Sequence, residues 1–163
     1  MKTIGSTIIM LALVPSLFAD NGKELKLTSP DGTHEIAFYQ KQVSPAVNEL
    51  CYRVDYKSQP VVNESRAGLE LDNRIWEMAL GARNLKQPAC WMDNLEVDSV
   101  TYQPETDITW QPLYGERSSV RDHYRAGTLY LSKKDNSGYR LNIEVRAYNE
   151  GVAFRYFFPE HPK

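Results

Sequence analysis

The sequence predicts an all-β protein, an antiparallel β-sandwich, and three observations predict it. First, apolar and polar residues alternate along most of the chain, as in strands that bury one face and expose the other. Second, turn-forming residues separate these runs. In Ser29-Pro30-Asp31-Gly32 the proline presets φ and the glycine accepts a positive φ. Third, the runs are short and numerous, which is typical of a sandwich or a barrel.

The first 19 residues predict a secretory signal peptide, which we exclude from the fold. Lys2 gives a charged start, the apolar run 8–18 is too short to span a bilayer, and Ala19 offers a cleavage point. An uncleaved membrane anchor is the alternative. We therefore expect a secreted or periplasmic protein with no membrane span after cleavage. Residues 20–163 have the length of one domain, too short to include a catalytic barrel as well.

The predicted strands follow in order, and each carries apolar residues on alternate positions. These rows are Ile36 and Phe38; Tyr52, Val54 and Tyr56; Leu95, Val97 and Ser99; Leu129 and Leu131; Leu141, Ile143, Val145 and Ala147; and Val152, Phe154, Tyr156 and Phe158. Residues 135–138 predict a hairpin turn between the fourth and fifth rows. Residues 74–85 have apolar positions at roughly helical spacing, so a short helix and an irregular connection both stay open there, followed by a loop over 87–94.

The last two strands predict a hairpin whose register follows from keeping both apolar rows on one face. The facing pairs are Val145–Phe154, Ile143–Tyr156 and Leu141–Phe158, with Glu144–Arg155 as an opposite-charge pair on the other face. This register implies a four-residue loop over 148–151 with Gly151 in the left-handed conformation. Pairing of Arg146 with Phe154 would contradict it.

Composition excludes some classes of function. The chain has 19 basic and 21 acidic residues and no basic block, so we expect no nucleic-acid partner. Its two cysteines, Cys51 and Cys90, would close a long loop if they paired in an exported protein. Sequence separation does not give the Cα distance that a disulfide requires, so pairing and separate roles both stay open.

One polar segment carries side chains suited to holding a sugar. Aromatic rings stack on the C–H face of a pyranose, and charged or polar groups bind its hydroxyls. The candidate substrate-binding residues are Trp110, Tyr114, Glu116, Arg121, His123 and Tyr124. The alternative, which we prefer, is structural: Trp110 and Tyr114 belong to the core, while Arg117 and Arg121 pair with Glu116 and Asp122 to fix a loop.

Evidence for catalysis or metal binding is weak. Glycoside hydrolysis needs two carboxyl groups across the scissile bond, and the spacing of Glu105, Asp107, Glu116 and Asp122 fixes no separation in space. The three histidines are far apart, and no calcium-binding loop motif occurs. We therefore assign no catalytic residue, metal ligand or cofactor to this chain.

Several segments together resemble the N-terminal domain of glycoside hydrolase family 97. They are Leu27-Thr28-Ser29-Pro30-Asp31-Gly32; Tyr52-Arg53-Val54-Asp55-Tyr56; Pro60-Val61-Val62; Ser65-Arg66-Ala67-Gly68-Leu69; Trp110, Pro112 and Tyr114-Gly115-Glu116; Arg121 with His123-Tyr124; and the final hairpin, residues 146–156. The resemblance implies a β-sandwich like that of sugar mutarotases, a supersandwich, which a (β/α)₈ barrel follows in the family. It also implies hydrolysis of α-linked glucose or galactose by the parent enzyme, with calcium at a site built mainly by the barrel.

The resemblance leads to a functional hypothesis for the chain. We expect a non-catalytic N-terminal domain that supports the downstream barrel and adds residues to its substrate site, without activity of its own. Because the chain stops at Lys163, where the family's sequence continues, an incomplete sandwich is an open alternative. A stand-alone carbohydrate-binding module and a secreted protein-interaction domain are the competing functions.

Overall fold

The fold is built from strands alone in the part of the chain that can be placed. The computed structural model describes residues 23–45, 47–71, 90–134 and 138–159. Within these ranges the regular elements are all β-strands, which confirms the all-β prediction. None of the described residues forms a helix long and apolar enough to cross a membrane. The predicted signal peptide and the segment 74–85 lie outside the described residues.

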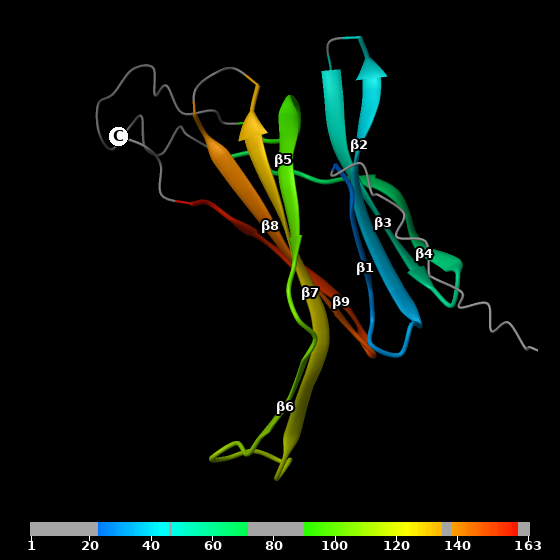
Figure 1. The fold of residues 1–163 in the computed structure, drawn as a ribbon, viewed down its shortest axis with the longest axis vertical. Helices are drawn as coiled ribbons and strands as arrows, with labels where there is room; N and C mark the ends of the chain where they lie inside the picture. The colour runs from blue at the N-terminus through cyan, green and yellow to red at the C-terminus, as the bar shows by residue number, and fades with distance from the viewer. Residues whose placement is uncertain (1–22, 46, 72–89, 135–137, 160–163) are drawn as a thin grey trace, which may run out of the picture.

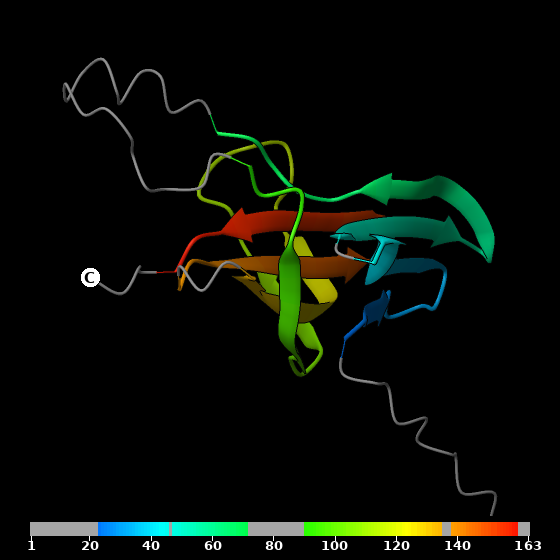
Figure 2. The same cartoon turned by 90° about the horizontal axis from the view of Figure 1, so that it is seen from above.

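Two antiparallel sheets make up the sandwich (Figures 1 and 2). The first sheet has the strand order β1-β2-β3-β4 and consists of β1 (Leu25–Thr28), β2 (His34–Ser44), β3 (Val47–Tyr56) and β4 (Gln59–Arg66). The second sheet has the order β5-β7-β8-β9, with β6 paired to β7, and consists of β5 (Leu95–Tyr102), β6 (Thr106–Trp110), β7 (Val120–Lys133), β8 (Arg140–Tyr148) and β9 (Gly151–Phe157). The predicted antiparallel β-sandwich is confirmed.

The core lies between the facing sheets. Its fully buried side chains come from the alternate positions that the sequence predicts, including Ile36 and Phe38 on β2 and Leu141, Ile143 and Val145 on β8. Burying a side chain of this size stabilises the fold by roughly 1.5–3 kcal/mol. Aromatic contacts connect the layers as well, because the Phe38 ring meets the Phe154 ring edge-on at 5.2 Å between centroids.

The predicted turn at residues 29–32 is confirmed. Ser29 is fully buried, and its hydroxyl donates to the Asp31 carboxylate at 2.6 Å. Gly32 has a φ of 75°, in the left-handed region that glycine enters without strain. The turn joins β1 to β2 and aligns Leu27 with Ile36.

The hairpin of β8 and β9 has the predicted register. Val145 lies opposite Phe154, Ile143 opposite Tyr156, and Glu144 opposite Arg155, whereas Arg146 faces Ala153. Two details of the prediction are wrong. Tyr148 pairs with Gly151, so only residues 149 and 150 connect the strands. The φ of Gly151 is 157°, a positive value that residues with a side chain rarely adopt, in line with the glycine expected there. Phe158 lies beyond the end of β9 and packs edge-on against Trp91 at 5.1 Å, so it forms no pair with Leu141.

A bulge corrects the predicted faces of β5. Leu95 and Val97 are buried as expected, but the register shifts between Val97 and Ser99. One extra residue in a strand moves the following side chains to the opposite face. Val100 therefore packs against the core, and Ser99 is exposed.

The two cysteines are both free. Cys51 is buried on β3, whereas Cys90 is exposed. The structure thus has the cysteines in separate roles rather than in a disulfide.

The second sheet extends beyond the sandwich as an arm, which we define as β6, the connection 111–119 and the first residues of β7, 120–124. β7 is 14 residues long, and its first part pairs with β6 while its last part crosses the sandwich between β5 and β8. Figure 1 shows the arm projecting away from both sheets. A segment in this position contributes little to the core and is well placed to contact a partner.

Candidate functional site

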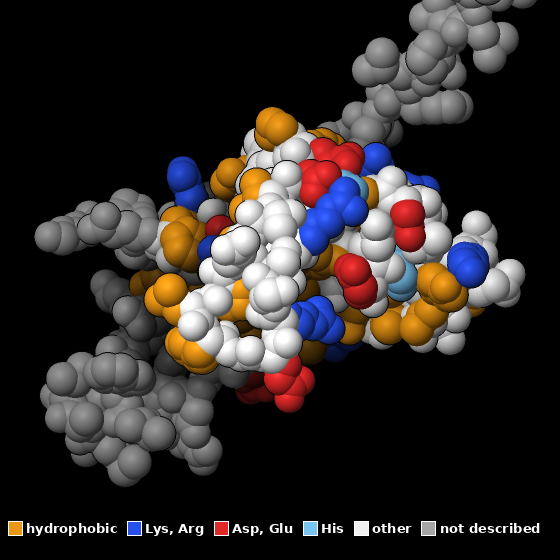
Figure 3. All heavy atoms as spheres, turned by 90° about the horizontal axis from the view of Figure 1, so that it is seen from below, with side chains coloured by type: hydrophobic (Ala, Val, Ile, Leu, Met, Phe, Trp, Pro, Cys, Tyr) orange, Lys and Arg blue, Asp and Glu red, His pale blue; other side chains and the backbone are white. Residues whose placement is uncertain are grey.

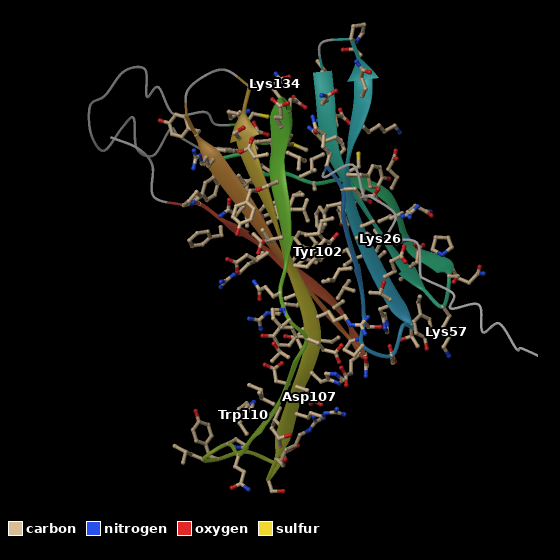
Figure 4. The ribbon with its side chains drawn as sticks, in the orientation of Figure 1. Lys26, Lys57, Tyr102, Asp107, Trp110 and Lys134 are labelled. Carbon is tan, nitrogen blue, oxygen red and sulfur yellow. The ribbon has the colours of Figure 1, made fainter. Side chains whose placement is uncertain are left out.

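All six residues predicted to bind a sugar lie on the arm. Trp110 ends β6 near the free end of the arm (Figure 4), and Tyr114 and Glu116 follow in the connection. The Trp110 side chain is 51% exposed and that of Tyr114 is 90% exposed. The structural alternative that placed both in the core is therefore wrong, and both rings are open to a stacking ligand.

Strand alternation divides the four of these residues that lie in strands between two faces. Asp107 lies opposite His123 and Thr109 opposite Arg121, so these side chains share one face of the arm. Trp110 and Tyr124 occupy the alternate positions and share the other face. The structure therefore brings Arg121 and His123 together, but it does not combine them with Trp110 and Tyr124 in one site.

The first face is an ion-pair cluster formed by Glu105, Asp107, Arg121, His123 and Arg125. The Arg121 guanidinium binds both oxygens of the Asp107 carboxylate at 2.7 Å each. Glu105 accepts from Arg125 Nε at 2.9 Å and lies 2.7 Å from His123 Nε2. Seen from the end at which the arm projects, acidic, basic and histidine side chains lie close together on the surface (Figure 3).

The partner of Arg121 differs from the predicted one. Asp122 follows Arg121 directly and so points to the opposite face of β7, whereas Asp107 lies on the neighbouring strand and on the same face. Among the described residues no ion pair joins Arg117 to Glu116 either. The cluster stabilises the arm itself rather than the loop at its end.

The electrostatics of this cluster do not suit acid catalysis. The hydrogen bonds from His123 and then Arg125 lower the pKa of Glu105, and the Arg121 hydrogen bond lowers the pKa of Asp107. A general acid needs a raised pKa, so that it carries a proton at the working pH. Both carboxylates are instead held ionised, which is typical of structural ion pairs.

The other face of the arm continues onto the outer face of β8, where an arginine is held by two tyrosines. The guanidinium carbon of Arg146 lies 4.4 Å from the Tyr124 ring centroid, and its Nη1 donates to the Tyr148 hydroxyl at 3.3 Å. One face of the Tyr124 ring is thus covered by a cation rather than open to a sugar. Sequence reasoning missed this group because it depends on the register between β7 and β8, which pairs Tyr124 with Tyr148.

Beside Arg146 the outer face of β8 and β9 forms a hollow of about 260 Å³. We call it the β8–β9 hollow, and its lining residues are Glu144, Arg146, Tyr148, Ala153, Phe154 and Arg155. Across it, Arg155 Nε and Nη2 both bind Glu144 Oε2, at 2.7 and 2.6 Å, which confirms the predicted opposite-charge pair. The hollow therefore combines charged, phenolic and small side chains.

The described residues do not fit a resident metal ion. Within them no group of three or more His, Cys, Asp or Glu side chains is placed to hold one. Calcium needs six to eight oxygen ligands, so no calcium chemistry is derived from this chain.

Comparisons with known proteins identify the family and support the fold. The profile of a family described as Glycosyl-hydrolase 97 N-terminal matches residues 27–163. A retaining alpha-galactosidase from Bacteroides thetaiotaomicron is 25% identical over 150 residues, which are 92% of this chain and 19% of that protein. The chain thus spans about a fifth of the length of this relative.

Solved structures give the same fold. A Glycoside Hydrolase Family 97 enzyme from Pseudoalteromonas sp. strain K8, in complex with acarbose, matches 84% of this chain and 18% of its own at a TM-score of 0.67 and 26% identity. A beta-arabinopyranosidase matches the same shares at a TM-score of 0.64 and 18% identity, which bears on the fold alone. In both cases the matched β-sandwich is a small part of a larger protein.

Proposed function

The chain belongs to the glycosyl-hydrolase 97 N-terminal family, and from that premise we propose that it is the non-catalytic N-terminal domain of a secreted, calcium-dependent α-glycosidase. In this role it supports a catalytic (β/α)₈ barrel and contributes residues to the edge of the substrate site. The substrate is an oligosaccharide with α-linked glucose or galactose, in line with the alpha-galactosidase activity of one relative and the acarbose bound to another.

One observation carries the proposal. The family profile covers residues 27–163, whereas this stretch is only about a fifth of the relatives' length. The carboxylates of the ion-pair cluster add support, because their lowered pKa values favour the ionised form over the proton-donating one. Chemistry in such an enzyme would reside in the remaining four-fifths, and so would most of the calcium ligands.

The decisive experiment is to read the genomic DNA beyond the codon for Lys163. An open frame that encodes a barrel supports the proposal, and expression of the longer product then gives hydrolysis of nitrophenyl α-glucoside or α-galactoside. The 163-residue chain by itself is the matched control, and it should give no turnover. Clear hydrolysis by this chain alone, or a stop codon with a folded and soluble product, would contradict the proposal.

Secretion has its own test. The charged start and the apolar run 8–18 support export with cleavage after Ala19. The N-terminal sequence of the exported protein should begin at Asp20. A protein whose N-terminal residue is still Met1 or Lys2 would contradict this part of the proposal.

A stand-alone carbohydrate-binding module is the second candidate, and the exposure of Trp110 and Tyr114 favours it. Stacking binders need such rings on the surface. A change in tryptophan fluorescence on addition of maltotriose, in the absence of any barrel, would support the module if Trp110→Phe removes it, since the chain has three tryptophans. Fluorescence that stays unchanged at saturating sugar would exclude the end of the arm as its binding site.

A further inference from the structure

We propose that the β8–β9 hollow binds one neutral sugar unit through two of its hydroxyl groups, with Arg146 as the donor and Glu144 as the acceptor. The inference rests on the proposed function only for the class of ligand, an α-linked oligosaccharide. None of the six residues that the sequence singles out lines the hollow, and only Tyr124 touches one of its lining residues, Arg146.

The position of the hollow leaves it open to a ligand. On β8, Glu144, Arg146 and Tyr148 alternate with the buried residues Val145 and Ala147, so they point away from the core. On β9, Ala153 lies opposite Arg146. Its single methyl group leaves the space above it unfilled between the longer side chains on either side.

Arg146 supplies hydrogen-bond donors that the described residues do not use. A guanidinium has five N–H donors, and among the described residues only the one to Tyr148 is formed. Within the same residues no carboxylate lies within ion-pair distance of Arg146, although Arg121, Arg125 and Arg155 each have one. Contact with the Tyr124 ring fixes the plane of the guanidinium, so its free N–H groups are held in place before a ligand arrives.

Glu144, two residues before Arg146 on the same face of β8, supplies a hydrogen-bond acceptor. Both bonds from Arg155 reach Glu144 Oε2, so Oε1 has no hydrogen-bond partner within the described part of the chain. Arg155 also neutralises the charge of this carboxylate and fixes its orientation. An oriented acceptor therefore lies beside an oriented donor.

This pairing selects for hydroxyl groups over other ligands. A hydroxyl both donates and accepts, so two neighbouring hydroxyls of a sugar ring satisfy Arg146 and Glu144 together. A carboxylate or phosphate has acceptors only, so it would satisfy Arg146 but would leave Glu144 Oε1 without a donor. The volume, about 260 Å³, is below the usual range for drug-sized ligands, so it suits one sugar ring rather than a longer segment.

The test is an NMR titration of the ¹⁵N-labelled 163-residue chain with maltotriose, raffinose and glucuronate as probes. We expect saturable shifts from either neutral sugar at the amides of residues 144–155, with a millimolar Kd. Arg146→Lys keeps the charge but loses the planar fork, and we expect the Kd to rise roughly ten-fold or more. Ala153→Leu should abolish binding by filling the hollow.

The matched control is Arg53→Lys, which makes the same change on the first sheet, where Arg53 contacts Glu35 and Asp55. Its Kd should stay at the wild-type value, and a dispersed spectrum for each variant shows that it is folded. The inference is overturned if neither neutral sugar gives saturable shifts, if the shifts fall only at residues 110–116, or if glucuronate alone binds. None of these results affects the barrel test, so the two proposals fail separately.

Discussion

The side-chain Oδ1 of Asn149 accepts a hydrogen bond from the backbone N–H of Asp31 at 3.0 Å, across 118 residues of sequence. Asn149 lies in the turn between β8 and β9, and Asp31 lies in the turn between β1 and β2. The bond therefore connects the two sheets at one end of the sandwich, where the core no longer holds them together.

Removal of this connection should weaken the fold. Asn149→Ala leaves the Asp31 N–H without its protein partner, and a neutral hydrogen bond contributes about 1 kcal/mol. We expect the free energy of unfolding in urea to fall by about that amount. Asn63→Ala is the control, since Asn63 is exposed on β4. Equal losses in the two variants would contradict a specific role for Asn149.

The same turn should make stability depend on pH in acid. The hydrogen bond from the Ser29 hydroxyl, followed by that from the Thr33 backbone, lowers the pKa of Asp31 from 3.8 to about 2. A carboxyl group whose pKa is lower in the folded than in the unfolded state stabilises the fold fully at a pH above its unfolded-state pKa. This stabilisation is lost as the pH falls towards the folded-state pKa. Stability should therefore decrease between about pH 4 and pH 2, on the values just given.

Asp31→Asn isolates this contribution. An amide does not titrate, so the variant should be less stable than the wild type at neutral pH but should lose less stability between pH 4 and pH 2. Urea midpoints at several pH values measure both slopes. Parallel curves for the two proteins would show that other carboxyl groups cause the acid sensitivity.

The sequence predicts the strands and their register well where one face of a strand is buried and the other is exposed to solvent. The β8–β9 register follows from two apolar rows, and the Glu144–Arg155 pair follows from the register. The prediction of which β5 side chains face the core is wrong after Val97. A bulge adds a residue there, and nothing in the pattern of apolar residues indicates it.

The surfaces are harder to predict, because they depend on pairings between strands distant in sequence. The sequence places Trp110 and Arg121 in one polar segment, but strand alternation puts them on opposite faces of the arm. Arg146 and Tyr124 meet only because β7 pairs with β8. Composition therefore singled out a polar segment that lies on the arm, but it did not show which of its side chains share a face.

Gly68 lies where a larger residue would collide with the chain. A methyl group added there would approach the Trp91 carbonyl oxygen to 2.5 Å and the Met92 Cα to 2.9 Å. The Gly68 N–H also donates to the Tyr156 hydroxyl at 2.8 Å, so the backbone cannot shift without loss of this bond. We expect Gly68→Ala to destabilise the fold by roughly 1–3 kcal/mol, the usual range for overpacking.

Gly115→Ala separates this clash from backbone strain. Gly115 has a φ of 123° and Gly68 one of 156°, so alanine is strained at both positions, but at Gly115 the added methyl group would meet nothing within 4 Å. Thermal unfolding should therefore show a larger loss for Gly68→Ala than for Gly115→Ala. Equal losses would mean that φ strain alone accounts for the effect and that the contact with Trp91 relaxes.

The arm should open more readily when its ion-pair cluster is broken, without loss of the sandwich. Glu105 connects β6 to β7 through His123 and Arg125, and it contacts no core residue through its carboxylate. Glu105→Gln removes the charge that both partners bind, so we expect faster amide hydrogen exchange over 106–110 and unchanged exchange at Ile143 and Val145. Glu116→Gln, an exposed change in the connection of the same arm, should leave the exchange rates of both regions unchanged.

The ion-pair cluster should also make the arm sensitive to acid. Because the pKa of Glu105 is lowered in the fold, protonation of this carboxylate should have the same effect as Glu105→Gln. Amide exchange in the wild-type arm, corrected for intrinsic rates, should therefore rise as the pH falls below 4.5. Faster exchange spread over the whole second sheet would show instead that the arm and the sandwich unfold as one unit.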